Sequence, residues 1–209
     1  MRGSPFFLKG LLIGFSIAAP VGPIGLLCIQ RTIAYGRKSG LVTGLGAATA
    51  DGLYGAVAAF GLTAISSFLV GQQFWFRLVG GIFLLYLGTK AFLSRPAGKA
   101  ATSSEESLFS AYGSTVFLTI TNPMTILSFA AVFAGLGLAN SSGGSASPTL
   151  MIVGVVLGST LWWFALSAGV SLFRSKFNTD SLRIVDRISG AILIGFSILA
   201  FASILRTAR

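Results

Sequence analysis

Histidine is absent from the 209-residue sequence, cysteine occurs once, at Cys28, and only five residues are acidic. A single cysteine excludes an intramolecular disulfide, and a chain without histidine lacks the most common protein ligand of transition metals. The chain also lacks the usual general base of enzymes, an acidic pair that could replace it, and a nucleotide-binding loop. We therefore expect no metal site, no cofactor and no enzymatic activity.

Charge of either sign is scarce. Charged residues make up 10% of the chain and hydrophobic residues 54%, whereas ordinary soluble domains carry about 25% charged residues. This composition excludes a soluble domain and predicts an all-α integral membrane protein. At roughly 20 residues for each helical crossing, the length allows about six spans and no sizeable soluble domain.

The net charge of +10 would suggest a nucleic-acid partner in a soluble chain. Here the basic residues lie between the apolar runs, where membrane topology places them. The lipid bilayer, and not a nucleic acid, is therefore the expected large partner.

Apolar runs predict spans over residues 6–30, 41–68, 74–92, 108–138, 149–173 and 188–205. Arg2 and Lys9 before the first run resemble a signal peptide, but the run continues past Pro20 to Ile29, so we interpret it as a retained span. A polar segment divides the chain into a first three-helix unit (1–93), a cytoplasmic linker (94–107) and a second three-helix unit (108–209).

A short motif recurs in the third and sixth predicted spans. Arg77-x-x-Gly80-x-Ile82 opens the third, and Arg187-x-x-Gly190-x-Ile192 opens the sixth. Proline-bearing breaks also fall in the first and fourth spans. This predicts a 3+3 repeat whose second copy is inverted in the membrane, an arrangement found in transporters. The alternative is that apolar helices share small-residue patterns by chance. Close helix packing is expected at three GxxxG motifs, namely Gly10/Gly14, Gly40/Gly44 and Gly154/Gly158.

The two breaks are candidate binding elements. The first contains Pro20, Gly22 and Pro23, and the second contains Thr121, Asn122 and Pro123. A helix that restarts inside the membrane presents free backbone N–H groups and the positive end of its dipole, which favours an anion such as a carboxylate. The alternative for each break is a simple kink.

Asp51 is the one acid inside a predicted span. A charge at that depth costs about 2.5–3.5 kcal/mol, so it is a functional candidate that faces an ammonium group or carries a proton. The alternative is a structural carboxyl group that bonds to Thr43, Thr49, Tyr54 or a neighbouring helix. An anion site with one acid beside it suits a zwitterion, which indicates an α-amino acid.

Orientation follows from the distribution of lysine and arginine. The loops after the first, third and fifth predicted spans hold ten basic residues, Arg31 among them, and the opposite side holds five, including Arg77. Because the basic side is cytoplasmic, both termini are predicted to lie outside the cytoplasm.

The sequence resembles the LysE-type amino-acid exporters nearly end to end. The resemblance is carried by Pro20-Val21-Gly22-Pro23, Gly36-x-x-x-Gly40-Leu41-x-x-Gly44-Leu45-Gly46 with Asp51, Arg77-Leu78-Val79-Gly80, Tyr86-Leu87-Gly88, Thr121-Asn122-Pro123-Met124-Thr125 and Asp186-Arg187-Ile188-Ser189-Gly190. It implies six helices, a bacterial inner membrane and export of amino acids or related small molecules. Many members of that family have Pro-Gly-Pro at the first motif, and many have lysine where this chain has Met124, so the substrate charge of lysine-bearing members should not be transferred.

The predicted function is a secondary exporter of amino acids or close derivatives that works by alternating access. The alternative is an ion or heavy-metal cation transporter of the same superfamily. One cysteine, no histidine and one buried acid are poor ligands for a soft cation. The glycine-rich faces allow a homodimer without requiring one.

Overall fold

The computed structural model describes residues 4–20, 22–60, 68, 71–93, 107–122, 124–129, 146–174 and 179–207. These residues form helices, and no strand occurs among them. Val21, Pro123 and the predicted linker up to residue 106 lie outside the described residues. The principal helices are α1 (Ser4–Ala18), α2 (Pro23–Tyr35), α3 (Arg37–Ala59), α5 (Gln73–Leu93), α6 (Leu108–Ile120), α8 (Ala146–Phe173) and α9 (Thr179–Thr207).

The helices are those of a membrane protein. Within the described part of the chain, three helical segments are long and apolar enough to cross a bilayer, namely Gln73–Leu93, Pro148–Phe173 and Arg183–Leu205, and the bent pair α1–α2 makes a fourth if it counts as one span. The helix α3 is long enough at 23 residues but rich in glycine, alanine and threonine, and α6 has only 13 residues. The all-helical class is therefore confirmed, whereas six spans stay a prediction.

The predicted break in the first span is confirmed. The first half ends at Ala18, the second begins at Pro23, and the two are bent by 78°. Pro23 has no backbone N–H and stands at the start of α2, where that donor would have no helical partner in any case. Gly22 precedes it in an extended conformation, and Leu26 N donates to Gly22 O at 3.0 Å. The local sequence therefore sets the bend.

The second break begins after Ile120, where α6 ends. Thr121 N donates to Phe117 O, and Asn122 N donates to Thr119 O, which tightens the last turn of the helix. A short helix over residues 124–129 follows. The helix is therefore interrupted at Thr121 and Asn122, directly before Pro123.

The second predicted span begins earlier than expected, because α3 begins at Arg37 and not near residue 41. Only Gly36 separates it from α2, and this residue has a positive φ of 99°, a conformation that favours glycine. The description of α3 ends before residue 61, so the rest of the predicted span lies outside the described residues.

The predicted close packing of two glycine motifs is confirmed. Helix α1 lies against α8, with Gly10 and Gly14 facing Gly154 and Gly158. A Cβ atom placed on Gly14 would lie 2.1 Å from Val155 O, and one on Gly158 would lie 2.0 Å from Leu11 O. The two backbones therefore touch without intervening side chains.

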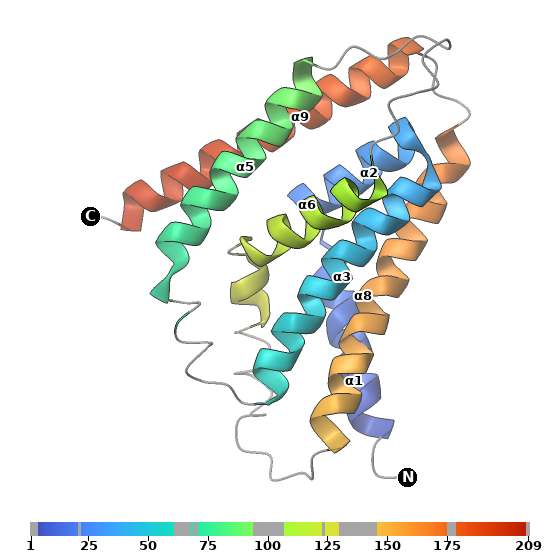
Figure 1. Cartoon of the computed structure of the whole chain (residues 1–209), viewed down its shortest axis with the longest axis vertical. Coiled ribbons are helices and arrows are strands. Elements are labelled where there is room, and N and C mark those ends of the chain that lie inside the picture. Colours follow the sequence, from blue (N-terminus) through green and yellow to red (C-terminus); the bar gives the residue numbers. More distant parts are fainter. Residues whose placement is uncertain are drawn as a thin grey trace.

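The helices α5 and α9 form an antiparallel pair that Figure 1 shows side by side, set apart from α1, α3 and α8. Gly88 lies against Gly190 and Ile194, while Gly81 lies against Phe201. Contacts elsewhere link α1 to α8 and α6 to α3. The inverted repeat and the division into two three-helix units stay predictions.

Arg31 was predicted to lie in a loop, and this prediction is wrong. It lies within α2, which continues to Tyr35, and its side chain is only 3% exposed. The guanidinium donates to Thr43 Oγ1 of α3 and to Ala111 O and Thr115 Oγ1 of α6. Those neutral acceptors, contributed by distant segments, allow the charge to be buried.

Candidate functional site

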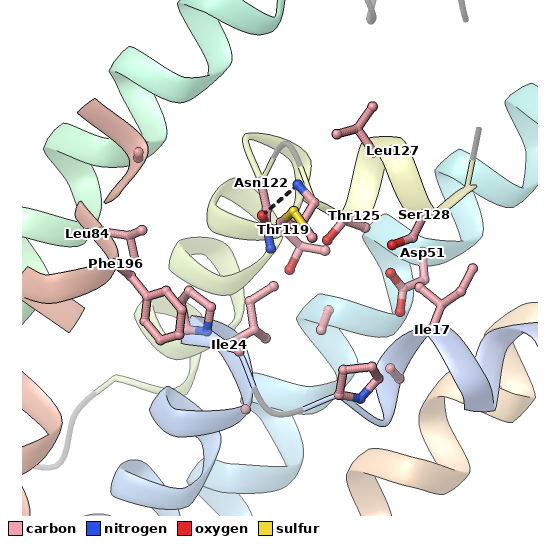
Figure 2. A pocket seen from close by; sticks show the side chains of 18 of the residues that line it. Ile17, Ile24, Asp51, Leu84, Thr119, Asn122, Thr125, Leu127, Ser128 and Phe196 are labelled. Carbon is pink, nitrogen blue, oxygen red and sulfur yellow. Dashed lines mark hydrogen bonds between the residues drawn. The ribbon is translucent and has the colours of Figure 1, made fainter. Parts of the chain in front are cut away.

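Both helix breaks and Asp51 line one cavity of about 570 Å³. The first break contributes Pro20, Gly22 and Pro23, and the second contributes Asn122. Figure 2 shows Asp51 of α3 and Asn122 of the second break on the wall of this cavity. The volume lies within the usual range of small-molecule sites, about 300–1,000 Å³.

The N-terminus of α2 lies at the cavity wall. Ile24 and Gly25, in the first turn, line the cavity. Their backbone N–H groups belong to the first turn, which has no partners within the helix, and Gly22 supplies no side-chain cap. The positive end of the helix dipole therefore lies at the cavity wall.

Asn122 lines the cavity and also forms a hydrogen bond within the chain. Its Oδ1 accepts a hydrogen bond of 3.1 Å from Met124 N, which caps the helix over residues 124–129. The backbone N–H of Met124 is one of the free donors that we predicted would face a ligand, and it is instead bonded to Asn122. Asn122 therefore shapes the second break and also faces the cavity.

Thr121 and Pro123 differ from the other predicted site residues. Thr121 is buried, donates from Oγ1 to Phe117 O at 2.9 Å, and lines a small adjoining pocket and not the main cavity. Pro123 lies outside the described residues. Thr119, Thr125 and Ser128 line the main cavity, although Thr119 also bonds its own helix at Thr115 O.

Asp51 is 3% exposed and is held by α8. Ser159 Oγ donates to Asp51 Oδ2 at 2.6 Å and accepts a bond of 3.0 Å from Trp163 Nε1. Among the residues that the structure describes, none donates to Asp51 Oδ1. One carboxylate oxygen is therefore fixed, and the other can meet a ligand.

The partners suggested for Asp51 from the sequence bond elsewhere. Thr43 accepts from Arg31, Thr49 donates to Leu45 O, and Tyr54 donates to Ile120 O. A neighbouring helix, the remaining suggestion, supplies the partner through Ser159.

Arg77 is a cavity residue that the sequence analysis missed. It lies in α5, is partly buried, and lines both the cavity and the small adjoining pocket. Its guanidinium donates to Gln73 Oε1 at 3.0 Å and to Ser203 O of α9 at 3.4 Å. Its position inside an apolar span was the available signal, but we counted it among the loop charges.

Apolar side chains make up most of the cavity wall. Ile17 lies near Asp51, whereas Leu84 and Phe196 lie on the side formed by α5 and α9 (Figure 2). Trp163 adds an aromatic wall beside Ser159. The cavity therefore offers a few polar contacts within a mostly hydrophobic surface, as small-molecule sites do.

Comparison with known proteins gives one family over most of the chain. The family described as LysE type translocator matches residues 15–203. A Bacillus subtilis protein named "Putative amino acid efflux protein YcgF" is 29% identical over 91% of this chain and 92% of its own length. The uncharacterized membrane protein YahN of Escherichia coli is 27% identical over 81% of this chain and 77% of its own.

A Pseudomonas aeruginosa protein named "Chemotactic transduction protein ChpE" is 25% identical over 93% of this chain and 96% of its own length. No solved structure matches the chain.

Proposed function

Because this chain belongs to the LysE type translocator family, we propose that it exports amino acids or close derivatives across the bacterial inner membrane by alternating access. The observation that carries this proposal is the single cavity lined by both helix breaks and by Asp51. The start of α2 suits a carboxylate, and Asp51 suits an ammonium group. Amino-acid efflux is also the activity in the name of the YcgF protein.

The arrangement of helices supports alternating access. Within the described residues, the pair α5–α9 meets the rest of the bundle mainly through α2 and α6, while α1 and α3 both pack on α8. The cavity lies where these two groups meet, since α9 contributes Phe196 and α3 contributes Asp51. Rocking of one group against the other would open the cavity to alternate sides of the membrane.

We propose six spans with both termini outside the cytoplasm. Arg31 is buried and Arg77 lines the cavity, so neither is a loop charge. Without them, nine basic residues remain on the proposed cytoplasmic side and four on the other. A reporter fused after Arg209 should be active outside the cytoplasm. Activity confined to the cytoplasm would contradict this topology.

An efflux screen tests the activity and identifies the substrate. Cells that lack their own exporters are loaded with dipeptides covering all amino acids, and the amino acids released into the medium are measured with and without the protein. We expect faster release of at least one amino acid. Equal release of all of them by expressing and control cells would contradict the proposed export.

The alternative of a metal-cation transporter has less support from the cavity. Asp51 is the one acid among the described residues that line it, and divalent cations require several oxygen, nitrogen or sulfur ligands. Growth with toxic metals, compared with growth with toxic amino-acid analogues, separates the two. Protection against the metals alone would favour the alternative.

A further inference from the structure

We infer, on the basis of the proposed function, that Arg77 binds the substrate carboxylate and that the substrates are α-amino acids whose side chain is uncharged and apolar. Neither the residue nor the class of side chain follows from membership of the family. The inference rests on the places of Arg77 and Asp51 in the cavity wall and on the mostly apolar residues that line the rest of it.

Arg77 lies beside the two elements that suit an anion. It lines the small adjoining pocket together with Pro23, at the start of α2, and Asn122, at the second break. All three also line the main cavity, so the guanidinium, the positive end of α2 and the amide of Asn122 belong to one region of the wall. A guanidinium binds a carboxylate through two parallel N–H donors, and a helix N-terminus adds a favourable potential.

The position of Arg77 is fixed by a residue of its own helix and by α9. Gln73 Oε1 accepts from Nη2, and Ser203 O of α9 accepts from Nη1. Both acceptors are uncharged, and they hold the guanidinium at the cavity wall on the side of α5 and α9. A preoriented donor loses less conformational entropy when it binds a ligand.

Asp51 lies on the other wall. Its carboxylate is fixed to Ser159 of α8, and it does not line the small pocket that contains Arg77. Figure 2 shows Asp51 beside Ile17 and Ser128, with Leu84 and Phe196 across the cavity on α5 and α9. In the proposed orientation, the amino acid directs its carboxylate toward Arg77 and its ammonium group toward Asp51, and both groups line the same cavity.

This orientation leaves no charged partner for the substrate side chain. Among the described residues that line the cavity, only Asp51 and Arg77 are charged. The remaining contacts are mostly apolar, from Ile24, Leu84, Leu127 and Phe196 among others. A charged side chain would lose its hydration without compensation, whereas an aliphatic one would gain hydrophobic contact.

The test uses the whole protein in liposomes and measures uptake of labelled leucine in competition with unlabelled compounds. Leucinamide lacks the carboxylate, and 4-methylpentanoate lacks the ammonium group. For the wild type, we expect leucine to compete about ten- to hundredfold better than leucinamide, because a charge-assisted hydrogen bond contributes that factor. Lysine and glutamate should compete weakly.

The variant Arg77→Gln should lose most of this preference. We expect the advantage of leucine over leucinamide to fall below tenfold, with leucinamide itself unchanged, because only the start of α2 and Asn122 then face the carboxylate. Arg77→Lys should restore part of the difference. A merely structural role would weaken all competitors alike. The matched control is Arg187→Gln, because Arg187 holds the corresponding place in the repeated motif but is exposed and lies outside the cavity; it should behave as the wild type.

Retention of the tenfold or greater preference for leucine by Arg77→Gln, or equal weakening of leucine and leucinamide, would overturn the assignment of Arg77. Stronger competition by lysine or glutamate than by leucine would overturn the side-chain class while leaving amino-acid export intact. If no amino acid is transported or competes, the proposed function fails and this inference fails with it.

Discussion

Asp51 of α3 and Ser159 of α8 are joined by a hydrogen bond of 2.6 Å between Ser159 Oγ and Asp51 Oδ2. Trp163 Nε1 donates to the same hydroxyl group at 3.0 Å. The serine therefore orients the buried carboxylate and also connects it to an aromatic wall of the cavity. Because the bond joins the two predicted halves of the chain, the acid keeps its position only while α3 and α8 stay packed.

Asp51→Asn should abolish transport while leaving the protein folded. An asparagine side-chain oxygen can still accept from Ser159 Oγ, but it cannot neutralise an ammonium group or carry a proton. Ser159→Ala should have a milder effect, about tenfold, because it removes the bond that orients a charge still present. Transport by purified protein in liposomes checks both, with size-exclusion profiles as the control for folding. Wild-type transport by Asp51→Asn would remove this acid from the mechanism.

Gly158→Ala should destabilise the packing of α1 on α8. The added Cβ atom would lie 2.0 Å from Leu11 O, so the helices must separate, at a cost of about 1–3 kcal/mol. Gly169→Ala is the matched control in the same helix, since a Cβ atom there meets nothing within 4 Å. Thermal unfolding in detergent should show a lower midpoint for Gly158→Ala alone. Equal midpoints for the two variants would mean that this contact is not tight in the membrane protein.

The features that the sequence predicted well are local ones. Proline lacks a backbone donor wherever the chain places it, so the start of α2 at Pro23 could be predicted from that residue alone. The glycines of α1 and α8 likewise marked the faces at which two backbones could meet. The unusual depth of Asp51 was visible because charges are rare in apolar segments.

The features that the sequence did not reveal depend on distant segments. Ser159 could not be chosen as the partner of Asp51, because the two are far apart in the chain and meet only through the packing of α3 on α8. Arg31 and Arg77 were counted as loop charges, since a buried guanidinium needs acceptors that only the folded protein assembles. Those acceptors are hydroxyl and carbonyl oxygens of α3 and α6 for Arg31, and Gln73 and Ser203 for Arg77.

Asn122→Asp should separate the two roles of this residue. Aspartate caps a helix about as well as asparagine, so the bond to Met124 N and the thermal stability should be kept. The new negative charge would face the same region as the substrate carboxylate, so transport should fall more than tenfold. Asn122→Ala should instead lower stability by about 1 kcal/mol through the loss of the cap. Unchanged transport by Asn122→Asp would mean that the carboxylate binds away from the second break.

Arg31→Lys should destabilise the protein although it preserves the charge. The guanidinium donates to Thr43 Oγ1, Ala111 O and Thr115 Oγ1, and through Nη2 to Ser114 Oγ at 2.9 Å, so it connects α2 with α3 and α6 at once. A lysine ammonium group is a single point of donation and cannot reach the same set of acceptors, so a buried charge loses hydrogen bonds worth about 1.5–3 kcal/mol. The exposed Arg183 provides the control, since Arg183→Lys disturbs no buried contact. Thermal unfolding in detergent should give a lower midpoint for Arg31→Lys than for Arg183→Lys, and matching midpoints would show that the contacts of Arg31 do not hold these three helices together.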